Sequence, residues 1–173
     1  MKTEAIKTLV KRSQKGDAEA FGELYEMYSN DMYGFAYYYT SSEYFAREAV
    51  SDAVLIAFQN IRMLKKAESF KSWLFKILFN CCKNKQKEKI IMSKQKEISA
   101  LDGFGNNEEE QNLRLDLEKA LESLSEEERR IVILSFVCGY SSDEIGKVLD
   151  LKSSTVRSKQ SRAVIKLRTF MFN

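Results

Sequence analysis

The chain has 173 residues, of which 44% are hydrophobic, 31% charged and 12% aromatic, and its formal net charge is +3. This is the composition of a folded globular protein, which excludes a disordered chain, and its length suits one medium domain or two small ones. No apolar run approaches the roughly 20 residues of a membrane helix, and the N-terminal stretch MKTEAIKTLVKR lacks the apolar core of a signal peptide. We therefore expect a cytoplasmic protein that does not insert into a membrane.

The composition also argues against an enzyme. Histidine is absent, which removes the commonest general base and metal ligand. The three cysteines, Cys81, Cys82 and Cys138, match no common zinc or redox spacing, and we interpret them as reduced packing residues. Neither a P-loop nor a glycine-rich dinucleotide turn is present. We expect no catalytic residue, no metal site and no cofactor.

The first half of the chain predicts three helices, and the absence of proline favours an all-helical fold. Apolar side chains with three-and-four spacing predict a helix over residues 17–39, capped by Asp17. A second helix follows the cap Ser42 and carries a stripe of small residues that would let a neighbouring helix approach closely. The third begins near Ser69 and continues into a block of lysines between residues 83 and 96.

The middle of the chain predicts a linker. The stretch ISALDGFGNNEEEQ, residues 98–111, combines glycine, asparagine and glutamate without periodicity. Between Asp102 and Glu128 ten acidic residues face only two basic ones, whereas the flanking segments are basic. Two basic blocks around an acidic spacer are typical of polyanion contacts. We expect two small helical domains, 1–92 and 113–173, joined by a flexible acidic linker, 93–112.

The second half predicts a compact run of four helices. Leucines at positions 113, 117, 121 and 124 mark the first helix. Capping boxes of the form S-x-x-E, at Ser125 with Glu128 and at Ser141 with Glu144, begin the next two. A short turn at residues 150–152 precedes a basic helix. This arrangement predicts a helix-turn-helix.

The last helix, SSTVRSKQSRAVIKLR, contains five basic residues and no acidic one. Its periodicity places Val156, Ala163, Leu167 and Phe170 toward the bundle. Small hydroxyl side chains and Ile165 lie on the opposite side, flanked by Arg157 and Arg162. Because phosphate would repel an acidic residue on that face, we predict that this helix lies in the major groove of DNA.

These motifs resemble a known family, the extracytoplasmic-function (ECF) subfamily of bacterial sigma-70 factors. Residues 120–168 are similar to the conserved domain that recognises the −35 promoter element. The stretches FAREAVSDAVLIAFQNI and SFKSWLFKILFN are similar to the domain that docks on the polymerase and opens the −10 element. The resemblance implies a sigma factor that binds core RNA polymerase and directs promoter recognition and transcription initiation.

The resemblance also implies three sets of site residues and a set of partners. For the −35 element they are Ser153, Ser154, Thr155, Arg157, Ser158, Lys159, Ser161 and Arg162. For the −10 element they are Lys71, Trp73, Asn80, Lys83, Asn84 and Lys87, and for polymerase docking Glu48, Ser51, Asp52 and Leu55. The implied partners are core RNA polymerase, through its β′ clamp helices and β flap, promoter DNA, and an anti-sigma factor of the kind that is often membrane-bound.

The chain departs from the family pattern at several of these positions. Glu48 and Ser51 stand where the family favours Asp and Gln, Asp150 stands where Gly is usual, and Gln160 replaces an apolar residue. The main alternative function is an autonomous helix-turn-helix regulator that binds DNA as a dimer without polymerase. Against it, no heptad seam for a dimer interface is evident. A cysteine-based redox enzyme is a third hypothesis.

Overall fold

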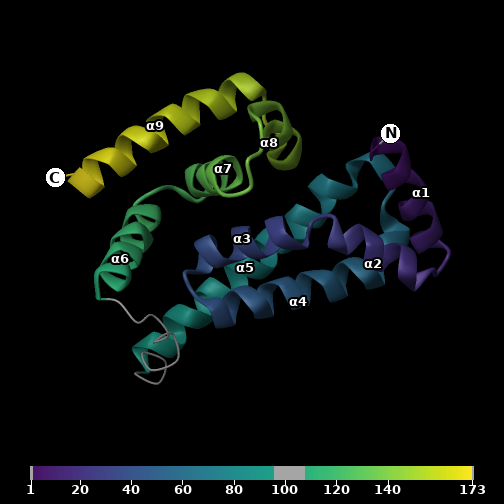
Figure 1. Cartoon of the computed structure of the whole chain (residues 1–173), viewed down its shortest axis with the longest axis horizontal. Helices are drawn as coiled ribbons and strands as arrows, with labels where there is room; N and C mark the ends of the chain where they lie inside the picture. The colour runs from purple at the N-terminus through teal and green to yellow at the C-terminus, as the bar shows by residue number, and fades with distance from the viewer. Residues whose placement is uncertain (1, 96–107, 173) are drawn as a thin grey trace.

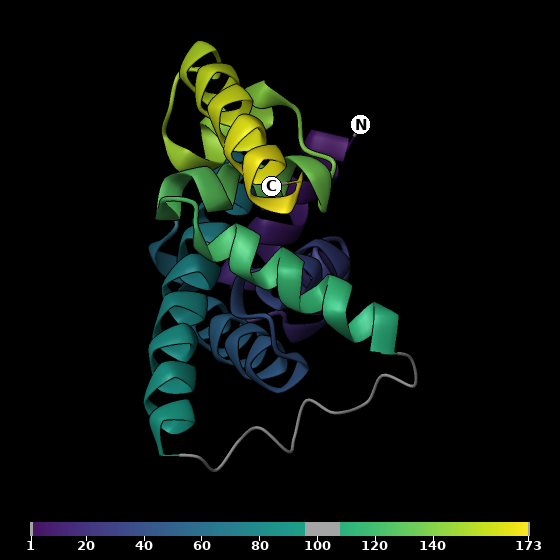
Figure 2. The ribbon, with the colours of Figure 1, turned by 90° about the vertical axis from the view of Figure 1, so that its left-hand side faces the viewer.

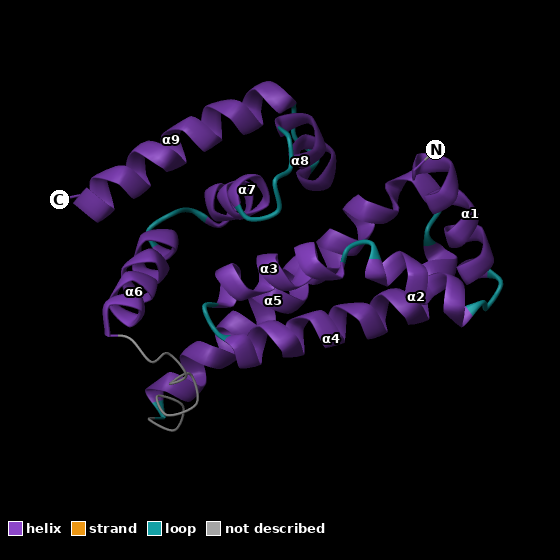
Figure 3. Ribbon diagram, in the orientation of Figure 1, coloured by secondary structure: helices purple, strands orange, loops and turns teal. Residues whose placement is uncertain are grey.

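The computed structural model describes residues 2–95 and 108–172, and all regular elements of these two ranges are helical (Figure 3). The N-terminal half contains α1 (Lys2–Gln14), α2 (Ala18–Glu26), α3 (Ser29–Thr40), α4 (Glu43–Asn60) and α5 (Phe70–Lys94), with two short 3-10 turns, η1 (Ile61–Met63) and η2 (Ala67–Ser69). The C-terminal half contains α6 (Glu108–Glu122), α7 (Glu126–Phe136), α8 (Ser142–Leu149) and α9 (Ser153–Phe172). The predicted all-α class is confirmed.

The structure corrects the sequence prediction in the first half. Helix α1 was not expected, and the single helix predicted over residues 17–39 is two helices, α2 and α3. The backbone leaves the helical conformation at Tyr28, whose ring lies 5.9 Å from that of Phe70. Leu24 before the break, Tyr28 at the break and Met32 after it all face the core. The apolar spacing therefore continues across the break and does not reveal it.

The core of the N-terminal half lies between α3, α4 and α5. The small stripe of α4 is buried as predicted, and Ala46, Ala49, Ala53 and Ala57 have no exposed surface. Because no larger side chain separates them, α4 and α5 lie directly against each other, and their contact is the most extensive between any two helices described. Phe35 of α3 and Phe75 of α5 fill the remaining space, and burial of such a ring stabilises the fold by about 1.5–3 kcal/mol.

The predicted starts of α7 and α8 are confirmed by their caps. Both capping boxes form, with Ser125 and Glu128 at α7 and with Ser141 and Glu144 at α8. Helix α7 ends at Phe136, and Gly139, in the turn that follows, has a φ of +68°. Asp150 ends α8 with a φ of +59°, the left-handed conformation that Asp tolerates. Helices α8 and α9 thus form the predicted helix-turn-helix.

One packing prediction for α9 is wrong. Val156 and Ala163 are fully buried and Leu167 is half-buried, but Phe170 is 46% exposed. The last turns of α9 extend beyond α7 (Figure 1).

The two halves pack against each other in the structure. Helices α6 to α9 lie across the bundle of α1 to α5, with α7 between α9 and α3 (Figures 1 and 2). Residues 98–107 of the predicted linker sequence belong to a stretch, 96–107, that lies outside the described residues. Helix α5 runs to Lys94 and α6 begins at Glu108, so both ends of the predicted linker, 93–112, are helical.

The helix-turn-helix requires glycine at position 146, because its turn leaves no room there for a side chain. A Cβ atom there would lie 2.5 Å from the carbonyl oxygen of Leu151, whereas one at Gly22 of α2 would meet nothing within 4 Å. We expect Gly146→Ala to lower the free energy of unfolding by about 1–3 kcal/mol and Gly22→Ala to raise it by about 0.5–1 kcal/mol. Urea unfolding followed by circular dichroism measures both. If the two variants are equally stable, the backbone of Leu151 does not approach position 146 as closely as described.

Glu128 connects α9 to the start of α7. The Nζ atom of Lys166 lies 2.8 and 2.9 Å from its two carboxylate oxygens, and Glu128 is only 8% exposed. Hydrogen bonds from Lys166 and from the Ser125 backbone hold the pKa of Glu128 below its usual 4.5. Its stabilising contribution is therefore complete above about pH 4.5 and is lost as the pH falls through the lower, folded-state pKa.

We expect Glu128→Gln to lower the stability at neutral pH by on the order of 1 kcal/mol. The variant should also lose less stability than the wild type between pH 5 and 3, because the titrating group is gone. Thermal unfolding across this range measures the effect, with the exposed Glu122→Gln as control. If the wild type and Glu128→Gln lose stability in parallel, Glu128 does not carry this pH dependence.

Candidate nucleic-acid and polymerase interfaces

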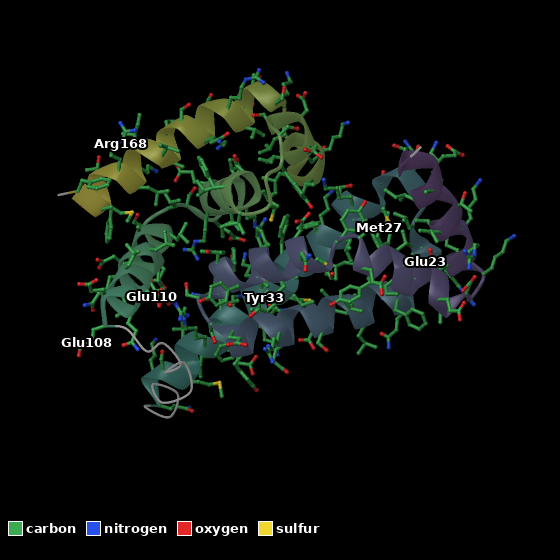
Figure 4. All side chains as sticks on the ribbon, in the orientation of Figure 1. Glu23, Met27, Tyr33, Glu108, Glu110 and Arg168 are labelled. Atoms are coloured by element: carbon green, nitrogen blue, oxygen red, sulfur yellow. The ribbon has the colours of Figure 1, made fainter. Side chains whose placement is uncertain are left out.

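The outer face of α9 carries five of the eight residues predicted for the −35 element. These exposed side chains are Ser154, Arg157, Ser158, Ser161 and Arg162, and Ile165 beside them is 63% exposed. Ser153 and Thr155 are half-buried at the start of the helix. Figure 4 labels Arg168 on the side of α9 turned away from α7, which extends this basic face toward the C-terminus.

Lys159 differs from the other predicted −35 residues. Its Nζ atom lies 2.9 Å from Oε1 of Glu127 on α7, so it points along the bundle rather than outward. Gln160, on the same side, donates a hydrogen bond of 2.8 Å to the hydroxyl of Ser135. This bond explains why a polar residue is accommodated at position 160, where the family usually has an apolar one: the hydrogen bond to Ser135 joins α9 to α7.

Helix α5 presents an exposed stripe with three of the predicted −10 residues, Asn80, Asn84 and Lys87. Lys76 lies on the same stripe, one turn before Asn80, and sequence reasoning missed it although the i, i+4 spacing could have found it. Trp73 is half-buried, with its ring 6.0 Å from that of Phe70.

Lys71 and Lys83, also predicted for the −10 element, turn toward the C-terminal half instead. The Nζ atom of Lys71 lies 3.1 Å from Glu144 of α8, and that of Lys83 lies 3.2 Å from Glu126 of α7. The structure therefore divides the predicted −10 set between an exposed stripe and a contact between the two halves.

The predicted docking residues share one face of α4. Ser51 and Leu55 are exposed, and Leu55 retains 56% of its accessible surface. Glu48 and Asp52 lie beside Lys85 of α5, with N–O distances of 3.8 and 3.4 Å. Burial disfavours the charge on Lys85, but the carboxylates of Glu88 and Asp52 outweigh it and raise its pKa.

Two apolar features next to this face were not predicted. Phe58, one turn beyond Leu55, is 45% exposed and continues the stripe. A groove of about 490 Å³ runs between α3 and α4, lined by side chains that include Tyr25, Tyr33 and Val54. Tyr33, labelled in Figure 4, lies on the front of the N-terminal bundle. The spacing of three residues between Leu55 and Phe58 was the sequence signal that could have placed Phe58 on this face.

The three cysteines are free thiols in packed surroundings. Cys82 is fully buried and Cys81 nearly so, and burial raises the pKa of both. Burial also raises the pKa of Cys138 to about 12. The thiols are therefore protonated at neutral pH and poor nucleophiles. Within residues 2–95 and 108–172, no group of Cys, Asp or Glu side chains is arranged to hold a metal ion.

The fold and these faces define a helical DNA-binding protein with a C-terminal helix-turn-helix. Two protein families match the chain, one in each half: residues 24–89 match Sigma-70 region 2, and residues 114–167 match Sigma-70 region 4. The chain belongs to the extracytoplasmic-function subfamily of the sigma-70 family. It is thus a sigma factor, a protein that directs promoter recognition at the start of transcription, and the hypothesis of an autonomous regulator is not favoured.

Individual relatives resemble the chain along most of its length. The ECF RNA polymerase sigma factor SigW of Bacillus subtilis is 24% identical over 177 residues, which cover 94% of this chain and 95% of that protein. The ECF RNA polymerase sigma-E factor of Escherichia coli K12 is 28% identical over 169 residues, covering 90% of this chain and 88% of that protein. Sigma factors are not enzymes.

Solved structures show the same fold. CnrH, in its complex with the cytosolic domain of CnrY, matches 96% of this chain with a TM-score of 0.75 and 20% identity, over 97% of that chain. The sigma factor RpoE of Bartonella quintana, in complex with the anti-sigma factor NepR, matches 87% of this chain with a TM-score of 0.62 and 22% identity, over 96% of that chain. No helix among the described residues has the length and apolarity needed to span a membrane.

Proposed function

We propose that the two halves of this sigma factor divide promoter recognition between them, with residues 113–173 recognising the −35 element and residues 1–92 the −10 element. The observation that carries the proposal is the outer face of α9. It is exposed, it contains Arg157 and Arg162 among small hydroxyl residues, and α9 has no acidic side chain anywhere along its length. Such a face fits the major groove without phosphate repulsion.

The exposed stripe of α5 is the proposed contact with the −10 element. Asparagine side chains at positions 80 and 84 can donate to and accept from unpaired bases, and Lys76 and Lys87 supply charge for the phosphates beside them. Trp73 packs on Phe70 and contributes to this site by fixing the start of α5.

The exposed face of α4 is the proposed docking site for core RNA polymerase, at its β′ clamp helices. Leu55 and Phe58 provide exposed apolar surface, which is typical of the centre of a protein interface. Glu48 and Asp52 lie at its edge and suit a basic partner. We further propose that the C-terminal half contacts the β flap and that the protein works in the cytoplasm, together with the polymerase.

We further propose that an anti-sigma factor binds this chain, and that the chain has no catalytic activity of its own. Support for the first point comes from RpoE of Bartonella quintana, a structural neighbour whose solved complex contains an anti-sigma factor. Support for the second comes from the absence of histidine in the sequence and from the raised pKa values of the three thiols.

The recognition helix can be tested with three alanine variants. We expect Arg157→Ala and Arg162→Ala to weaken promoter binding of the holoenzyme by about 1–3 kcal/mol each. Lys159→Ala should have a smaller effect, because Lys159 is held by Glu127 on the inner side of α9. Gel-shift titration on genomic fragments that the wild type transcribes measures all three. If all three variants lose promoter binding equally, the outward face of α9 is not the face that contacts DNA.

The docking face can be tested by reversing one charge. We expect Glu48→Lys to weaken binding to core polymerase at least about tenfold, equivalent to about 1.4 kcal/mol, by placing a positive charge beside Lys85 at the proposed edge of the interface. Co-purification and in vitro transcription measure the effect. Glu68→Lys makes the same charge change on the exposed turn η2 and should leave polymerase binding unchanged. Wild-type recovery of polymerase by Glu48→Lys would exclude this face.

A further inference from the structure

Lys85 of α5 lies among three carboxylates. Its Nζ atom is 3.8 Å from Oε2 of Glu48, 3.4 Å from Oδ2 of Asp52 and 3.3 Å from Oε2 of Glu88. Glu48 and Asp52 belong to the proposed docking face of α4, whereas Glu88 lies one turn further along α5. We call Lys85 and these three residues the carboxylate cluster. One ammonium group and three carboxylates give the cluster a formal charge of −2.

The cation of this cluster lies behind the carboxylates. The side chain of Lys85 is 15% exposed, whereas each of the three acidic side chains is about half exposed. Cys81, one turn before Lys85 on α5, is buried. A partner that approaches this face therefore meets the carboxylates first, and Lys85 contacts it mainly through them.

The surroundings of Lys85 set it apart from its neighbours in the lysine block of residues 83–96. The sequence predicted contacts with a polyanion for this block, but three carboxylates beside Lys85 would repel a phosphate. Asn84 and Lys87, by contrast, lie on the exposed stripe of α5. Lys85 therefore has a different role from the residues proposed to contact the −10 element.

The two carboxylates of α4 would repel each other if Lys85 were absent. Glu48 and Asp52 are four residues apart, so they lie one above the other on the same face of the helix. Like charges at this spacing destabilise a helix and favour side-chain conformations that separate them. Because Lys85 attracts both carboxylates from the neighbouring helix, it draws them toward one point between α4 and α5. Their positions beside Leu55 are thus fixed before a partner binds.

We propose that Lys85 is a positioning residue for polymerase docking, which holds Glu48 and Asp52 in the arrangement that a basic patch of the polymerase contacts. The inference rests on the proposed docking site on α4 and deepens it, because it adds a residue of α5 that acts through that site. Ordering the two carboxylates in the free chain reduces the conformational entropy that is lost on binding. Lys85 thereby strengthens docking, although its charge has the same sign as that of the partner.

The sign of this charge distinguishes positioning from simple charge attraction. Lys85→Met removes a positive charge and changes the formal charge of the carboxylate cluster from −2 to −3. If net charge alone determined docking to a basic partner, this variant would bind more tightly than the wild type. If Lys85 positions the carboxylates, the variant binds more weakly, because Glu48 and Asp52 are free to separate.

Binding of the full chain to immobilised core RNA polymerase, followed by biolayer interferometry, measures this difference. We expect Lys85→Met to weaken binding at least about fivefold, mainly through faster dissociation. Lys85→Arg keeps the positive charge and should bind within about threefold of the wild type. Lys94→Met makes the same charge change at an exposed position near the end of α5 and should bind like the wild type. Equal or tighter binding of Lys85→Met overturns the inference.

A double-mutant cycle shows whether Lys85 acts through the carboxylates of α4. In a chain that carries Glu48→Gln and Asp52→Asn, Lys85→Met should change the affinity for polymerase by less than about twofold, because the charges that it positions are gone. A loss as large as in the wild-type background contradicts the positioning role, since Lys85 would then act through the fold. Circular dichroism verifies that the variants remain helical, and Lys85→Gln gives the same test if Lys85→Met loses helicity.

The same variants separate failure of the inference from failure of the proposed docking site. If the chain with Glu48→Gln and Asp52→Asn binds core polymerase as tightly as the wild type, the docking face on α4 is wrong and the inference falls with it. If that chain binds more weakly but Lys85→Met does not, the docking face stands and only the positioning role of Lys85 is overturned.

Discussion

The four buried alanines of α4, from Ala46 to Ala57, allow this helix to lie directly against α5, and that contact orients the functional faces of the N-terminal half. With one side of each helix fixed in the core, α4 presents Leu55 and α5 presents Asn80 outward. The same packing points Phe75 and Phe79 toward the C-terminal half, where Tyr140 and Arg130 meet them. Larger residues in the alanine stripe would separate α4 from α5 and rotate all three faces.

Local chemistry made the C-terminal half the more predictable one. The two capping boxes and the short turn at residues 150–152 are encoded within a few residues, and the structure contains them as predicted. At the break, Tyr28 packs against Phe70, more than forty residues away, and periodicity carries no information about such a contact. Helix α1 was missed although Ile6, Leu9 and Val10, which pack in the N-terminal core, have the three-and-four spacing of a helix.

For the candidate sites, the sequence could predict which residues share a helix face, but not which ion pairs they form with other helices. Sequence spacing placed Arg157 and Arg162 on the exposed side of α9, where the structure has them. Spacing could not show that Lys159 pairs with Glu127, nor that Lys71 and Lys83 face carboxylates far along the chain. Each of these ion pairs depends on how separate helices pack, and charge patterns along a single helix do not contain that information.

The hydrogen bond between Gln160 and Ser135 has a consequence for how this protein can diverge. A directional bond, together with the buried Val156 and Ala163, fixes the rotation of α9 about its own axis from the inner side alone. The outward residues, such as Ser158 and Ser161, take no part in that attachment. Substitutions there leave the attachment of α9 unchanged. If the proposed −35 contact is made by this face, related genes can acquire new targets by changing a few exposed positions.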